Sequence, residues 1–231
     1  MPDAQPRVSL LESLRARSAA ARNVDTPQRE TRADELRDID RRLTSAFRWL
    51  DEALTHLGAI RPVVEHCFAL GAALAIAAPR FDGGFVASRR RQRAGLDLVE
   101  RVELFYRMSN GSPLRFEVPQ AAVSELCERL RAAQLEFDYR MRSDAPRATP
   151  ACLFTVAPVV RASVLFRPDY DRRVVMTTLR NVDRLETVTL DFAPAIIGES
   201  ALEDLVRLML GESNAFLKRA PLEGVGVRTA A

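Results

Sequence analysis

The sequence predicts an α+β protein: an antiparallel sheet of about six or seven strands with helices on one face, preceded by a long amphipathic heptad helix. Two observations lead to this fold class. Apolar residues recur with a seven-residue period between residues 36 and 60, as in helices that pack against other helices. Beyond residue 97 the apolar residues alternate with polar ones, as in half-buried strands, and two helical patterns interrupt this alternation.

The heptad helix is predicted over residues 34–61. Large apolar residues form its seam, and they are Leu36, Ile39, Leu43, Leu50 and Leu57. Ala46 and Ala53 leave the stripe thin, which allows close approach of whatever packs on it. Because just over three heptads are marginal for an independent coiled coil, the helix needs tertiary support. We expect it to pair with its copy in a homodimer, to pack on its own domain, or to bind an unlike protein partner.

The remainder of the chain divides by composition. Residues 1–33 are polar, rich in Arg and Ala and interrupted by prolines, which predicts a disordered tail. Residues 62–96 are interpreted as a connector that holds an apolar run and an arginine cluster. Residues 97–220 are predicted to form the α+β domain, and residues 221–231 a flexible tail.

A β-hairpin is predicted where Asn110-Gly111, a pair favoured in tight turns, separates two alternating segments around residues 102–108 and 114–118. A helix follows near residues 123–130. Further strands are predicted at residues 135–141, 151–156, 159–167, 173–179 and 185–192. Ser200 and Glu203 have the spacing of a capping box at the start of a last helix.

Composition excludes several classes of site. The only lysine is Lys218, near the C-terminus, which excludes a P-loop and disfavours Schiff-base chemistry. Three cysteines without a C-x-x-C spacing predict neither a disulfide framework nor a cysteine zinc site. Gly83-Gly84 is not followed by a helix start and does not match a dinucleotide fingerprint. We therefore expect no cofactor and no metal.

The chain is expected in the bacterial cytoplasm. Its strong preference for arginine over lysine is typical of a GC-rich bacterial genome, and no secretory signal is recognised at the N-terminus. The apolar run over residues 67–78 is shorter than the roughly 20 residues of a membrane span, so no transmembrane segment is predicted.

The arginine cluster consists of Arg89, Arg90, Arg91 and Arg93. These side chains could bind phosphates of nucleic acid or of an anionic lipid. The net charge is only +3, and no aromatic residues are interleaved with the cluster in a stacking pattern. The alternative is a solvated face or a set of ion pairs within the fold.

The sequence favours a non-catalytic interaction protein, an adaptor, assembly or regulatory factor that acts through its heptad helix and its α+β domain. One alternative is a nucleic-acid-associated protein that uses the arginine cluster. The other is an enzyme with an active site on the α+β domain that no local motif reveals, since no catalytic residue can be named.

Overall fold

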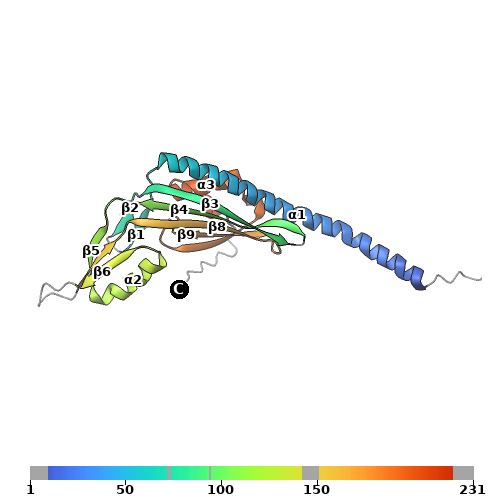
Figure 1. Ribbon diagram of the computed structural model, residues 1–231, viewed down its shortest axis with the longest axis horizontal. Coiled ribbons are helices and arrows are strands. Elements are labelled where there is room, and N and C mark those ends of the chain that lie inside the picture. Colours follow the sequence, from blue (N-terminus) through green and yellow to red (C-terminus); the bar gives the residue numbers. More distant parts are fainter. Residues whose placement is uncertain (1–9, 72–73, 94, 142–150, 221–231) are drawn as a thin grey trace, which may run out of the picture.

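The computed structural model describes residues 10–71, 74–93, 95–141 and 151–220 (Figure 1). The helices are α1 (Leu10–Ile60), α2 (Val123–Ala132) and α3 (Glu199–Leu210), with short 3-10 turns η1 (Gln120–Ala122), η2 (Pro194–Ile196) and η3 (Phe216–Arg219). The strands are β1 (Cys67–Ala69), β2 (Ala75–Ala77), β3 (Arg80–Arg93), β4 (Leu96–Ser109), β5 (Leu114–Pro119), β6 (Phe137–Met141), β7 (Ala151–Val156), β8 (Val159–Asp169), β9 (Val174–Arg180) and β10 (Thr187–Phe192). The α+β class is confirmed.

The strands form three antiparallel sheets, so the prediction of one sheet of six or seven strands is wrong. The main sheet has five strands in the order β10-β9-β8-β4-β3. A small sheet has the order β5-β7-β6, and β1 pairs with β2 in a two-stranded ribbon. Alternation in a sequence shows that a strand is half-buried, but it does not show which strand lies beside it.

The predicted hairpin around Asn110-Gly111 is wrong for this reason. β4 pairs with β3 and β8 in the main sheet, whereas β5 pairs with β7 in the small sheet. Asn110 instead links separate segments of the chain. Its main-chain N–H donates to the carbonyl of Pro158, and its side-chain amide donates to the carbonyl of Ala77.

The segment from 62 to 96, expected to be a connector, contains β1, β2 and β3. β3 runs for 14 residues along the edge of that sheet, beside β4. Its apolar and polar residues do not alternate cleanly because every residue from Ala87 to Arg93 is exposed and the pairing contains two irregularities.

α1 begins at Leu10, in the segment expected to be a disordered tail, and has 51 residues. Alanine and arginine, two of the best helix formers, are frequent in this segment. Figure 1 shows the last part of α1 lying along the main sheet and its first part projecting beyond it. α3 lies beside α1 on the same face of the sheet.

The predicted capping box at the start of α3 is wrong. α3 begins at Glu199, with Gly198 as its N-cap, so Ser200 lies inside the first turn. The Ser200 hydroxyl accepts a hydrogen bond from Arg219, which also pairs with Asp204 at 2.6 Å. The hydrogen bond from Arg219 lowers the pKa of Asp204, and the pair holds η3 against α3.

The heptad seam of α1 lies in the core of the chain. Leu43 and Leu50 are fully buried, and Leu36, Ile39 and Leu57 are at most 8% exposed. They belong to the same apolar cluster as the inward-facing residues of β4 and β8 and the apolar face of α3. One face of the main sheet is therefore covered by α1 and α3, and this layer is the core.

We predict that Leu50→Ala lowers the free energy of unfolding by about 2–5 kcal/mol, because it leaves a cavity where a fully buried side chain packs between α1 and the sheet. Ile60→Ala, on the same helix but 71% exposed, is the control and should change it by less than about 0.5 kcal/mol. Urea denaturation of both variants measures the difference. Equal values would mean that α1 does not pack on the sheet.

Candidate interaction surface

The structure brings all five predicted seam residues together inside one chain. Leu36, Ile39, Leu43, Leu50 and Leu57 are buried among the chain's own residues. Of the three expected arrangements of the helix, packing on its own domain is the one that this chain adopts. Pairing with a copy or with an unlike helix stays a prediction, and the surface available for it lies elsewhere than on these five side chains.

Asp40 fixes the position of α1 along the sheet. Its carboxylate accepts a hydrogen bond from the main-chain N–H of Val99 on β4, at 2.7 Å, and lies 3.2 Å from the guanidinium of Arg90 on β3. Arg90 also donates to the carboxylate and to the carbonyl of Asp97, both at 2.7 Å. The hydrogen bond to Asp97 raises the pKa of Arg90, so this guanidinium is a permanent link between α1, β3 and β4.

Tyr170 completes the same junction. The pairing between β4 and β8 ends at Val102, so the main-chain groups of Val99 have no partner strand on that side. The Tyr170 hydroxyl donates to the carbonyl of Val99 at 2.7 Å, and burial raises the pKa of Tyr170, which keeps it a neutral donor. Arg93 lies over the Tyr170 ring, 5.6 Å from its centroid, and pairs with Asp171.

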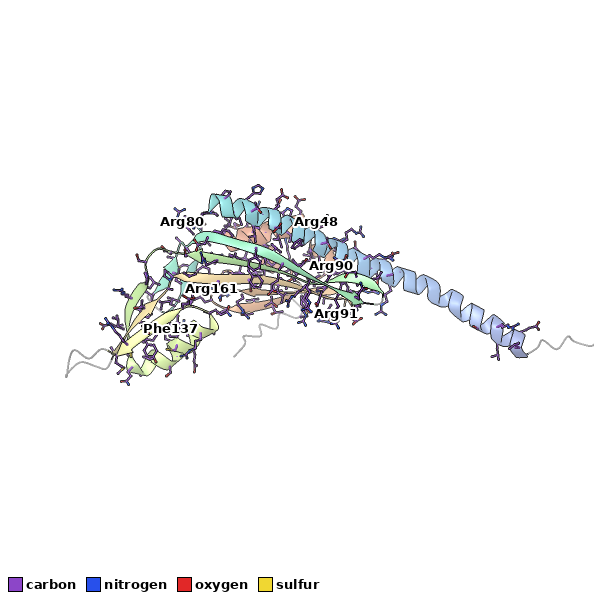
Figure 2. All side chains as sticks on the ribbon, in the orientation of Figure 1. Arg48, Arg80, Arg90, Arg91, Phe137 and Arg161 are labelled. Carbon is purple, nitrogen blue, oxygen red and sulfur yellow. The ribbon has the colours of Figure 1, made fainter. Side chains whose placement is uncertain are left out.

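The predicted anion-binding cluster lies at this end of the main sheet (Figure 2 labels Arg90 and Arg91). Arg89 pairs with Glu100 at 2.9 Å, and Arg91 lies 3.9 Å from the same carboxylate. Arg90 and Arg93 hold the aspartates described above. All four arginines therefore have carboxylate partners within the fold, and a polyanion would have to compete with them. A phosphate site here stays a prediction.

We predict that Asp40→Ala lowers the free energy of unfolding by about 1–3 kcal/mol, because the Val99 N–H and Arg90 lose their acceptor. Asp34→Ala is the matched control, since Asp34 is on the same helix and its ion pair is with exposed Arg37, one turn away. It should cost less than about 0.5 kcal/mol. Thermal or urea unfolding checks both, and similar losses would contradict the role given to Asp40.

The opposite face of the main sheet is not covered by any described helix (Figure 1). We call it the open face. It consists of the outward-pointing residues of β3, β4, β8, β9 and β10, which include Phe85, Arg101, Glu103, Phe105, Arg107, Arg161, Ser163, Leu165, Arg167, Asp169, Met176, Thr178, Arg180, Thr189 and Asp191. An antiparallel sheet can leave one face to solvent, but such a face normally carries polar residues rather than aromatic rings.

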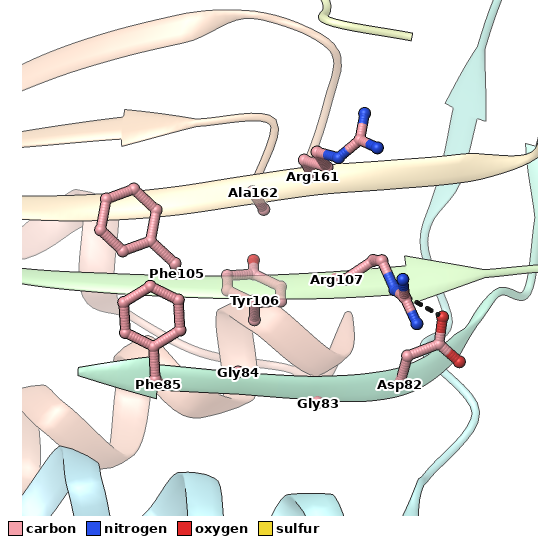
Figure 3. Close-up of a pocket in the computed structure, with 9 residues that line it drawn as sticks. All are labelled: Asp82, Gly83, Gly84, Phe85, Phe105, Tyr106, Arg107, Arg161 and Ala162. Carbon is pink, nitrogen blue, oxygen red and sulfur yellow. Dashed lines mark ion pairs between the residues drawn. The ribbon is translucent and has the colours of Figure 1, made fainter. Parts of the chain in front are cut away.

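Two aromatic rings lie side by side on the open face. Phe85 on β3 is the register partner of Phe105 on β4, and the ring centroids are 5.1 Å apart with the planes at 30°. Figure 3 shows both rings in front of the sheet, on the same side as Arg107 and Arg161. Phe85 is 59% exposed. An aromatic pair left this open is typical of a surface that another molecule covers.

A hollow of about 450 Å³ lies beside the aromatic pair (Figure 3). Its lining residues are Asp82, Gly83, Gly84, Phe85, Phe105, Tyr106, Arg107, Arg161 and Ala162. The β3–β4 register shifts between Phe81 and Gly83, which is the mark of a β-bulge. Gly83 and Gly84 therefore belong to a bulged edge strand.

Gly84 has no room for a side chain. A Cβ at this position would lie 2.5 Å from the Phe105 carbonyl oxygen and 2.9 Å from the Tyr106 Cβ. The absence of a side chain lets β3 approach β4 closely, and this approach brings Phe85 against Phe105.

The charged groups around the hollow differ in their partners. Asp82, with its side chain only 9% exposed, lies 3.2 Å from Arg107 and 3.1 Å from Arg61. Arg161 pairs with Glu136 at 2.6 Å. Asp82 is therefore engaged in ion pairs with two guanidinium groups, one from the loop after α1 and one from β4.

Comparison with known proteins assigns no family. No protein-family model, curated protein or solved structure significantly matches this chain. Within the described residues, no helix combines the length and the apolar character that crossing a membrane requires. In the same part of the chain, no three His, Cys, Asp or Glu side chains are grouped so that they could hold a metal ion. The function of the chain is therefore inferred from its own geometry.

Sequence reasoning missed the open face, although one signal was present. In the alternation of β4, Phe105 shares its phase with Arg101, Glu103 and Arg107, the residues expected to point outward. An aromatic residue among outward-pointing charged residues indicates an exposed ring. That Phe85 would lie beside it could not be predicted, because the pairing of β3 with β4 and its bulge depend on tertiary structure.

We predict that Gly84→Ala destabilises the protein by more than about 1 kcal/mol, because the added methyl group forces β3 away from β4. Gly58→Ala is the control: nothing lies within 4 Å of a Cβ at that position, and alanine in a helix should stabilise by about 0.5–1 kcal/mol. Denaturation curves measure both. A Gly84→Ala protein as stable as the parent would contradict the close approach.

Proposed function

We propose that this chain is a non-catalytic interaction protein of the bacterial cytoplasm, an adaptor, assembly or regulatory factor, and that its open face binds a partner protein. The observation that carries the proposal is the Phe85–Phe105 pair, with one ring 59% exposed, beside a hollow on an uncovered sheet. Exposed aromatic rings next to arginines have the composition of interface hot spots.

The layer behind the sheet supports this proposal. The buried seam of α1 and the Asp40 junction hold β3 and β4 in one arrangement. Side chains on a sheet braced in this way are ordered before a partner arrives, so binding loses less conformational entropy than it would on a mobile loop.

The two alternatives have less support. The nucleic-acid hypothesis rests on the arginine cluster, whose four members are already paired with carboxylates. The enzyme hypothesis needs convergent titratable groups in a hollow, and at the hollow of the open face Asp82 is neutralised by Arg61 and Arg107.

Site-specific photo-crosslinking tests the proposal. Phe85 is replaced by the aromatic photo-crosslinker benzoylphenylalanine in the full chain, expressed in its own cells. Tyr139, 43% exposed on the small sheet, carries the same group as the matched control. We expect a discrete protein adduct from position 85, at least about tenfold stronger than from position 139, since hot-spot residues dominate an interface.

The adduct should also disappear when Arg161→Glu is added to the position-85 protein, because this change reverses a charge that lines the same hollow. Adducts of equal strength from positions 85 and 139, or none from position 85, would contradict the proposed function. Circular dichroism of each variant confirms that the fold is retained.

A further inference from the structure

Arginines surround the apolar centre of the open face. Strand registers place Phe85, Phe105, Ser163 and Arg180 in one row across the sheet. With strands about 4.8 Å apart, the Cα of Arg180 is roughly 10 Å from that of Phe105, within reach of one bound segment. On the same face, the next pair in one direction brings Arg107 beside Arg161, and the second pair in the opposite direction brings Arg167 beside Met176.

The apolar centre extends beyond the two rings. Leu165 on β8 and Met176 on β9 are partly exposed on the same face. The hollow, the aromatic pair and these two aliphatic side chains follow a diagonal across four strands, which we call the apolar strip, and Glu103 lies beside Leu165 at its edge. A strip of this kind accepts apolar side chains from a partner.

The charge around the strip is mixed, with more arginines than acidic residues. Its arginines are Arg101, Arg107, Arg161, Arg167 and Arg180, and the acidic residues on the same face include Asp82, Glu103, Asp169 and, on β10 beside Met176, Asp191, which pairs with Arg172. Asp82 is almost buried and already holds two arginines. Arg167 and Arg180 are exposed and form no ion pair with any described residue. They are the guanidinium groups that remain free for a ligand.

We propose that the partner of the open face is an acidic protein segment that carries an aromatic or large aliphatic side chain. That side chain enters the hollow against Phe85 and Phe105. Carboxylates on either side of it pair with Arg180 and Arg167, whose planar guanidinium groups bind carboxylates in bidentate fashion. This inference rests on the proposed function and gives its partner a chemistry.

Single-stranded nucleic acid fits the same face less well. A nucleic-acid backbone carries a negative charge at every nucleotide and needs a continuous positive path. Here Glu103 lies between Ala87 and Leu165 in the sheet, and Glu136 is bound to Arg161. A polyphosphate is charged at every nucleotide and would meet these carboxylates, whereas a peptide can place neutral residues opposite them. Leu165 and Met176 also offer no ring on which a base could stack.

Fluorescence anisotropy with defined probes tests this inference on the full chain. The main probe is a fluorescein-labelled peptide, Ser-Glu-Phe-Glu-Glu-Phe-Glu-Ser, at about 0.15 M salt. Two matched peptides have every Glu replaced by Gln or every Phe by Ser, and an oligothymidylate of similar length is the nucleic-acid probe. We expect the main peptide to bind and both matched peptides to bind at least about tenfold more weakly.

Protein variants locate the binding. Arg180→Glu and Phe85→Ala should each weaken binding of the main peptide about tenfold or more, because one reverses a free charge and the other removes half of the aromatic pair. Arg48→Glu is the control: Arg48 is exposed on α1, away from the open face (Figure 2), and this change should alter affinity less than about twofold.

Several results would overturn the inference. They are no binding of the main peptide, binding that Arg180→Glu leaves unchanged, or oligothymidylate binding that is tighter than peptide binding and sensitive to the same variants. Light scattering that shows a dimer broken by Phe85→Asp would make a second copy the occupant instead. If position 85 still forms a protein adduct in cells while the acidic peptide fails, the proposed function stands and only the acidic chemistry falls.

Discussion

An apolar stripe on α1, centred on the fully buried Leu43 and Leu50, lies against one face of the five-stranded sheet, and the rest of the structure depends on this contact. The seam excludes water from the inner sides of β3 and β4 and packs beside α3. Burial of the seam alone would allow the helix to slide. Asp40 prevents this, because its carboxylate binds one main-chain N–H of β4 and one arginine of β3.

The same contact decides which surface is left for partners. A helix whose seam is buried under its own sheet does not offer that seam to others, and the sheet that it covers has its second face open. On that face the bulge at Gly83-Gly84 brings Phe85 against Phe105 and leaves a hollow beside them. The arginines around residues 89–93 could bind a polyanion only if they were free. They are already bound to carboxylates of the fold.

Local patterns predicted several elements well. The helical period of α1 and the alternation of β4 and β9 follow from which residues avoid water, and each can be read from neighbouring residues. The pairing of strands was not predictable in this way. Asn110-Gly111 has the composition of a hairpin turn, yet β5 leaves for the small sheet because β4 is already paired on both sides. Nor could the open face be located, since Phe85 and Arg180 are 95 residues apart in sequence and meet only across four strands.

The sequence by itself determined that this chain has a long helix with one apolar seam, an antiparallel α+β body and a nearly balanced charge, because periodicity and composition are properties of neighbouring residues. Only the tertiary structure decided what covers the seam, how the strands divide among three sheets, and which arginines remain unpaired. These depend on contacts between distant segments that compete for the same partners: Asp40 with Arg90, Tyr170 with Val99, and Phe85 with Phe105. Which of these contacts form depends on the free energy of the whole fold rather than on any one stretch of residues.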